Sequence, residues 1–169
     1  MRLIHMVALL LGSSSTSVGC DPGPSAPDPA RPSAAEPAAI LEFIDARGYA
    51  GEGWRPETDV PRPEDTNVSP HDRVQVFQNE TLITGRQGDW IPPDSMAVKV
   101  MYDGDDVVGH ALLWQLPDTA GITWFCYGPT HRCGYAEQAH PRDAPVFGTG
   151  SQVVCGQCHG GLVFTRIAP

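Results

Sequence analysis

The chain has 169 residues and a formal net charge of −9, with 20 acidic side chains against 11 lysines and arginines. This excess of acid argues against a nucleic-acid partner, because binding to phosphates requires a basic surface. The length is typical of one domain with additional segments, since domains usually contain about 100–150 residues. The 17 prolines and 18 glycines favour short strands and loops over long helices.

Residues 1–20 have the pattern of an export signal, with Arg2 followed by a mostly apolar run and then small residues. The apolar run is shorter than the about 20 residues that a membrane-spanning helix needs. The segment ends in Ser-Val-Gly-Cys20, which resembles a bacterial lipidation sequence with Ser17 in place of the usual leucine. We expect an exported periplasmic or cell-surface lipoprotein, or an ordinary cleaved signal in which Cys20 has no role.

Residues 21–38 consist mainly of proline, alanine, serine and acidic side chains. Such a segment buries too little apolar surface to offset the entropy of ordering, so it is expected to be a disordered tether. A tether after a lipid anchor would hold a domain away from the membrane. The folded domain is therefore predicted to span residues 39–169.

The first predicted element of this domain is a short helix at residues 39–48, where four apolar side chains recur with helical spacing. Gly48 is its expected C-cap. Residues 51–70 are rich in proline and glycine and are predicted to form a loop, with Trp54 as its one packed aromatic anchor.

Strands dominate the middle of the chain, and we expect one antiparallel sheet of about four to five strands, an α+β, mainly β fold. Val74 and Val76 illustrate the alternating pattern. Residues 79–89 are predicted to form a turn or a short helix, Asp103-Gly104-Asp105 is a hairpin turn, and residues 128–150 are irregular. The predicted strands are residues 73–78, 95–102, 107–116 and 122–127.

The most specific motif is Cys155-Gly-Gln-Cys158-His159, the Cys-x-x-Cys-His attachment sequence of a c-type haem. The two thiols can each add to a vinyl group of one porphyrin, and the adjacent imidazole can bind the iron as an axial ligand. We expect this C-terminal segment to form a short helical turn. Half of a zinc knuckle and a redox dithiol are the alternatives.

Two further cysteines, Cys126 and Cys133, flank a six-residue loop. In an oxidising compartment they are expected to form a disulfide. The alternative is a four-thiolate zinc site in which Cys126 and Cys133 join Cys155 and Cys158. That site would leave His159 unexplained.

Lys99 is the only lysine among the 11 basic lysine and arginine side chains. Unlike arginine, it has a primary amine that can lose its proton and act as a nucleophile. Spacing alone predicts a solvent-facing lysine on a half-buried strand, with Ala97 and Met101 on the same face.

The order of these segments resembles the cytochrome P-460 family. The shared features are an Arg-Val-Gln-Val-Phe strand, an Ala-Val-Lys99-Val strand, a strand with Trp124-Phe125, and Cys-x-x-Cys-His followed by Val-Phe-Thr-Arg166. The resemblance covers about residues 39–169. It implies a mainly β domain, often a homodimer, with one haem c and His159 as the only protein ligand of the iron.

The resemblance also implies function. In the namesake members a lysine at the position of Lys99 is bonded to the haem, and the enzyme oxidises hydroxylamine and passes electrons to a periplasmic carrier. Relatives without that bond, the β-type cytochromes c′, bind nitric oxide or carbon monoxide. A third possibility is electron transfer alone, with a sixth iron ligand from His110, Met96 or Met101.

Oxidation of hydroxylamine needs a proton acceptor, because the N–H protons of the substrate must leave. Residues 146–154, directly before the haem motif, contain no acid. The nearest candidates are Glu137, His140 and Asp143, each of which is alternatively a solvated loop residue.

Overall fold

The computed structural model of the protein describes residues 30–62, 73–87, 90–117, 121–128, 133 and 140–149. The predicted signal at residues 1–20, including Cys20, lies outside the described residues. So do Glu137 and the predicted haem-attachment turn with Cys155, Cys158 and His159.

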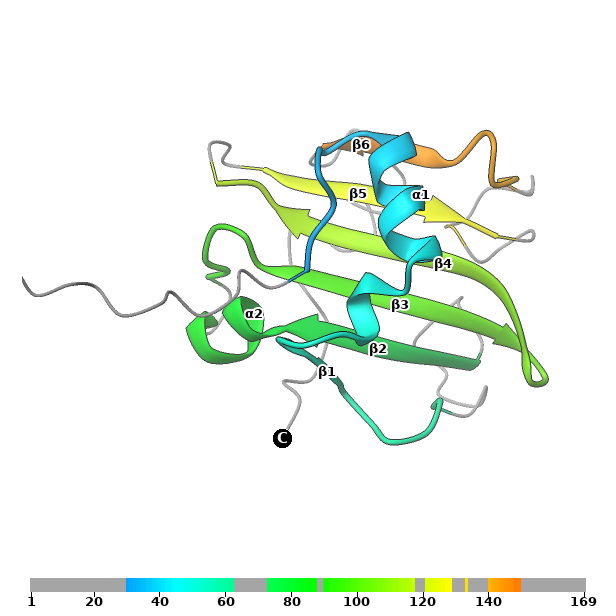
Figure 1. The fold of residues 1–169 in the computed structure, drawn as a ribbon, viewed down its shortest axis with the longest axis horizontal. Helices are drawn as coiled ribbons and strands as arrows, with labels where there is room; N and C mark the ends of the chain where they lie inside the picture. Colours follow the sequence, from blue (N-terminus) through cyan, green and yellow to red (C-terminus); the bar gives the residue numbers. More distant parts are fainter. Residues whose placement is uncertain are drawn as a thin grey trace, which may run out of the picture.

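The described residues form one antiparallel sheet in which each strand pairs with its neighbours in sequence (Figure 1). The strands are β1 (Trp54–Pro56), β2 (Arg73–Asn79), β3 (Met96–Asp103), β4 (Asp106–Gln115), β5 (Ile122–Tyr127) and β6 (Val146–Thr149). The prediction of a mainly antiparallel β fold is confirmed, and β2 to β5 are the four strands expected. The expected number of about four to five strands is wrong, because two short edge strands, β1 and β6, lie where irregular structure was expected and bring the described sheet to six strands.

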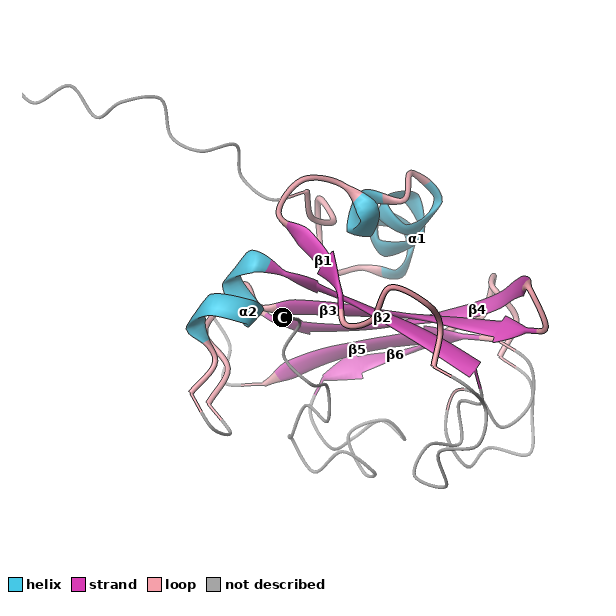
Figure 2. Cartoon of the chain, turned by 90° about the horizontal axis from the view of Figure 1, so that it is seen from below, coloured by secondary structure: helices cyan, strands magenta, loops and turns pink. Residues whose placement is uncertain are grey.

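The helices are few and short: α1 (Pro37–Asp45), the 3-10 turn η1 (Gly48–Ala50) and α2 (Glu80–Gly85). Helix α1 lies across one face of the sheet (Figure 2). The prediction that Gly48 caps this helix is wrong, because Arg47 adopts a left-handed φ of 52° and starts η1. Gly48 instead packs against the ring of Phe43, where a Cβ would collide.

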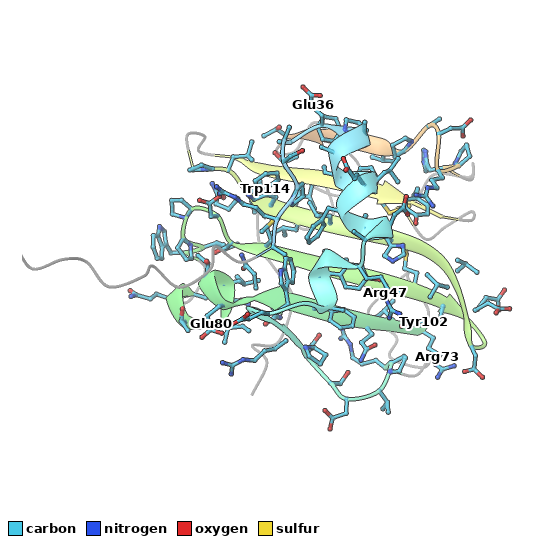
Figure 3. The ribbon with its side chains drawn as sticks, viewed as in Figure 1. Glu36, Arg47, Arg73, Glu80, Tyr102 and Trp114 are labelled. Carbon is cyan, nitrogen blue, oxygen red and sulfur yellow. A yellow bond between two sulfur atoms is a disulfide. The ribbon has the colours of Figure 1, made fainter. Side chains whose placement is uncertain are left out.

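The sheet has two different faces, because successive side chains of a strand point to opposite sides. On the α1 face, apolar side chains of the strands pack against Ile40, Phe43 and Ile44 of the helix. Trp114 and Tyr102 belong to this face (Figure 3). The strand residues that form the core of the α1 face are Met96, Val98, Val100, Leu112, Trp114 and Phe125.

The opposite face is called the Lys99 face here, after the one lysine of the chain. Its apolar side chains form two clusters, one around Trp124 and Leu113 and one around Met101 and Cys126. The strand residues of this face are Val74, Val76, Ala97, Lys99, Met101, Ala111, Leu113, Ile122, Trp124 and Cys126.

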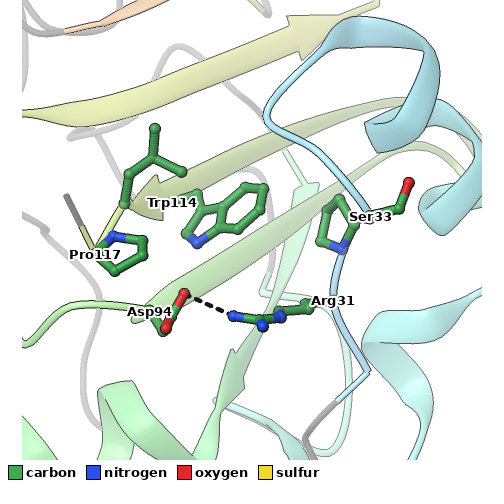
Figure 4. Close-up of a pocket in the computed structure, with 7 residues that line it drawn as sticks. Arg31, Ser33, Asp94, Trp114 and Pro117 are labelled. Carbon is green, nitrogen blue, oxygen red and sulfur yellow. Dashed lines mark hydrogen bonds and ion pairs between the residues drawn. The ribbon is translucent and has the colours of Figure 1, made fainter. Parts of the chain in front are cut away.

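Residues 30–38, which composition assigned to the tether, contact the sheet domain. The indole Nε1 of Trp54 donates to the carbonyl of Ala30 at 2.8 Å, and Arg31 forms an ion pair with Asp94 at 3.1 Å. Beside this ion pair lies a pocket of about 640 Å³, with Trp114 in its wall (Figure 4). The described part of the chain contains no helix long and apolar enough to cross a membrane.

Candidate functional site

Lys99 lies in the middle of β3, where its side chain is half-buried on the Lys99 face. The register places it directly opposite Val76 of β2 and Ala111 of β4. Ala111 in turn lies opposite Cys126 of β5. These four residues therefore form one row of side chains across the sheet, because directly paired residues of an antiparallel sheet point to the same side.

The immediate neighbours of Lys99 on its face are apolar. Along β3 they are Ala97 and Met101, two positions before and after, and across the sheet they are Val76 and Ala111. Two of these four residues, Ala97 and Ala111, have only a methyl group as side chain, so little side-chain volume surrounds Lys99 at these two positions. The amine therefore projects from an apolar part of the sheet.

Cys126 in this row forms a disulfide with Cys133, with a Cα–Cα distance of 5.6 Å, and the row continues to Val146 of β6. Both half-cystines are buried and pack with Val74 and Met101. The same two sulfurs are thus used in a covalent bond and do not serve as thiolate ligands of the alternative zinc site. Among the residues that the structure describes, no group of three or more His, Cys, Asp or Glu side chains is placed to bind a metal ion.

At the other end of the row lies Glu57, which the sequence analysis did not single out. Its backbone N–H donates to the carbonyl of Val76 at 2.7 Å and continues the pairing of β1 by one residue, which puts Glu57 on the Lys99 face. The side chain is only 1% exposed, and its carboxylate forms an ion pair with Arg62 at 3.2 Å. Arg62 is held nearby because its own N–H donates to the carbonyl of Val74 at 2.7 Å.

Glu57 follows a stretch rich in proline and glycine, and no periodic pattern marks it as buried. Its burial depends on the way in which the chain after β1 leaves β2 and returns to it at Arg62. A buried carboxylate normally needs a positively charged or hydrogen-bonding partner, and Arg62 supplies one here. In the sequence alone, this ion pair is visible only as an acidic and a basic residue, Glu57 and Arg62, five positions apart in a predicted loop.

Two of the predicted acid–base residues before β6, His140 and Asp143, are described by the structure. His140 pairs through its backbone with Gly128, and Asp143 is exposed. Arg142, which separates them, forms an ion pair with Asp45 at the end of α1. Glu137 lies outside the described residues.

The proposed sixth ligands of the iron are all engaged within the domain. His110 points to the α1 face and is hydrogen-bonded to Tyr49 and Tyr127. Met96 is fully buried in the core of the same face, and Met101 is fully buried on the Lys99 face beside Cys126. His110 and Lys99 therefore lie on opposite sides of the sheet.

The described part of the Lys99 face fits the chemistry of a haem. A porphyrin is a flat, largely apolar ring, and the small and aliphatic side chains around Lys99 match it in polarity, although Val76, Ala97 and Met101 are buried in this structure. The residues expected to attach it, Cys155, Cys158 and His159, lie outside the described residues. No protein-family model matches the chain, and no curated protein and no solved structure shows significant similarity to it.

Proposed function

We propose that the chain is an exported, lipid-anchored c-type cytochrome that oxidises a small nitrogen compound such as hydroxylamine. Cys155 and Cys158 would attach one haem c, and His159 would bind its iron. The observation that carries the proposal is the position of Lys99, the only lysine of the chain, at the centre of an apolar sheet face. An exported domain and electron transfer to a periplasmic carrier belong to the same proposal.

The residues around Lys99 would hold the haem and exclude water from it. Val76, Ala97 and Ala111 would offer apolar contacts, and Lys99 would be the residue that lies at the ring edge. When bound, a haem with one open axial position supplies a redox-active iron that binds small ligands such as hydroxylamine or nitric oxide.

Glu57 is the side chain best placed to accept the protons that hydroxylamine loses. It lies in the same row of the same face as Lys99, two strands away, and strand spacing puts the two backbones about 10 Å apart. Arg62 lies 3.2 Å from the carboxylate of Glu57 and holds it in place on this face. Glu57 takes the place of Glu137, His140 and Asp143 in the proposal.

Binding of nitric oxide without turnover is the second candidate. The apolar neighbours of Lys99 favour it, because a neutral diatomic ligand has no proton to give and needs no acid–base group. A simple electron carrier is less well supported, since His110, Met96 and Met101 are packed or hydrogen-bonded within the domain.

The absorption spectrum of the mature protein tests these candidates, with Lys99→Arg as the variant that keeps the charge and removes the nucleophile. A red-shifted ferrous Soret band that disappears in Lys99→Arg supports the cross-linked enzyme. An ordinary high-spin spectrum that changes with nitric oxide supports the binding protein. A low-spin spectrum that ignores added ligands indicates electron transfer, and zinc without a Soret band contradicts the haem assignment altogether.

A further inference from the structure

Three side chains on the α1 face form a continuous hydrogen-bonded chain. The hydroxyl of Tyr49 lies 3.2 Å from Nε2 of His110, and Nδ1 of His110 lies 2.8 Å from the hydroxyl of Tyr127. The three residues come from η1, β4 and β5, so the chain links separate elements. Both ring nitrogens of His110 therefore form hydrogen bonds with tyrosine hydroxyls.

The imidazole of His110 is neutral at pH 7, with one nitrogen protonated and the other able to accept a proton. His110 is only 6% exposed, and burial, together with the nearby charge of Arg142, lowers its pKa to about 4. The other charged groups around it are Asp45, which opposes this shift, and Arg47, which adds to it. Tyr102 is a further titratable group, and it interacts electrostatically with Tyr49.

The phenols hold their protons. Burial raises the pKa of Tyr127 and of Tyr49 above the ordinary value, so both phenols are protonated and neutral at physiological pH. A phenol that loses an electron becomes a strong acid and must release its proton at once. Its oxidation is therefore easiest where a base already accepts a hydrogen bond from it, at the 2.6–3.2 Å separation that proton transfer requires.

From this geometry we infer that Tyr127 is a redox-active tyrosine with His110 as its proton acceptor. In the step, Tyr127 gives one electron to an outer-sphere one-electron oxidant, and the O–H bond breaks as its proton moves to Nδ1 of His110. The products are a neutral tyrosyl radical, an imidazolium and the oxidant reduced by one electron. The inference rests on the described residues alone and goes beyond the proposed reaction at Lys99.

The hydrogen bonds of Tyr49, His110 and Tyr127 are compatible with the state before proton transfer and with the state after it. The step uses the tautomer of His110 with its proton on Nε2, in which Nδ1 accepts from the hydroxyl of Tyr127 and Nε2–H donates to the oxygen of Tyr49. After proton transfer, both imidazole nitrogens are donors, and each already faces a phenol oxygen. No side chain has to rotate, and the high cost of the buried imidazolium returns the proton when the radical is reduced.

Tyr102 is a natural comparison for Tyr127 within the same sheet. An arginine lies over each ring with 5.8 Å between guanidinium carbon and ring centroid, Arg73 over Tyr102 (Figure 3) and Arg142 over Tyr127. The hydroxyl of Tyr102, however, donates at 3.4 Å to the side-chain amide oxygen of Gln75, which is a very weak base. The two phenols thus differ chiefly in the proton acceptor.

The test is oxidation of the mature, full-length protein with hexachloroiridate(IV) at pH 7, followed by electron paramagnetic resonance of the frozen sample. We expect a tyrosyl signal in the wild type and in Tyr102→Phe, and its loss in Tyr127→Phe. His110→Gln, which keeps hydrogen-bonding groups but removes the base, is expected to lower the yield at least tenfold. Protein grown with ring-deuterated tyrosine identifies the signal, because its hyperfine splitting then collapses.

A second measurement on the wild type needs no variant to fold. The radical yield is expected to fall as the pH is lowered through about 4, where His110 gains a proton and stops being an acceptor. A wild-type yield that Tyr127→Phe leaves unchanged would overturn the assignment of the radical. An equal yield in His110→Gln, or a yield independent of pH between 7 and 3, would overturn the role of the imidazole.

Discussion

The buried imidazole of His110 makes a quantitative prediction about the stability of the domain. Its pKa is about 4 in the folded protein against an ordinary value of 6.5. Between these values the unfolded chain binds a proton that the folded chain does not, so the free energy of unfolding decreases as the pH falls from 6.5 to 4. The difference of the two pKa values corresponds to about 3 kcal/mol, fully lost below pH 4.

The matched variant is His110→Gln, because glutamine does not titrate and still offers one donor and one acceptor to Tyr49 and Tyr127. At pH 7 we expect its free energy of unfolding to lie within about 1.5 kcal/mol of the wild-type value. Urea unfolding followed by tryptophan fluorescence at pH 7, 5 and 4 measures both proteins. Carboxylates titrate alike in the two chains, so the wild type should lose about 3 kcal/mol more than the variant over this range. Parallel loss of stability in both would refute the assignment to His110.

Three further changes have defined outcomes. Glu57→Gln is expected to lower hydroxylamine turnover by about 10²–10⁴-fold while nitric oxide affinity stays constant; the surface control Glu80→Gln should leave both unchanged, and normal turnover in Glu57→Gln would remove this residue from the mechanism. Replacing Cys126 and Cys133 by serine should lower the free energy of unfolding by about 2–3 kcal/mol in urea titrations, since the loop they close is short. Gly109→Ala should lower the midpoint of thermal unfolding, at a cost of about 1–3 kcal/mol, because a Cβ would collide with the β5 backbone; an unchanged midpoint would contradict this packing.

Strands with a clear alternating pattern were predictable, and strands defined only by their neighbours were not. Val74 and Val76 mark β2, whereas β1 (Trp54–Pro56) is too short to show any period. It exists because its backbone pairs with the outer edge of β2, a long-range event that local sequence does not encode.

The residues of the candidate site also divide into those that the sequence predicts and those that depend on long-range contacts. Lys99 was noticeable from composition, and the alternation of β3 placed it correctly beside Ala97 and Met101. The burial of Glu57 depends on a strand pairing formed by a loop, and the contact of Tyr49 with His110 joins residues 61 positions apart. Neither leaves a trace in the spacing of residues, because each is created by the way in which separate segments meet.

The disulfide between Cys126 and Cys133 also bears on how the protein matures. Attachment of a haem as proposed needs reduced thiols at Cys155 and Cys158, yet an exported chain meets oxidants as it emerges. Four cysteines can pair in three ways, and the pair only seven positions apart is the one that the fold uses. Once Cys126 and Cys133 are joined, they cannot form mispaired disulfides with Cys155 or Cys158. The disulfide would thereby keep Cys155 and Cys158 together as the pair for the proposed haem.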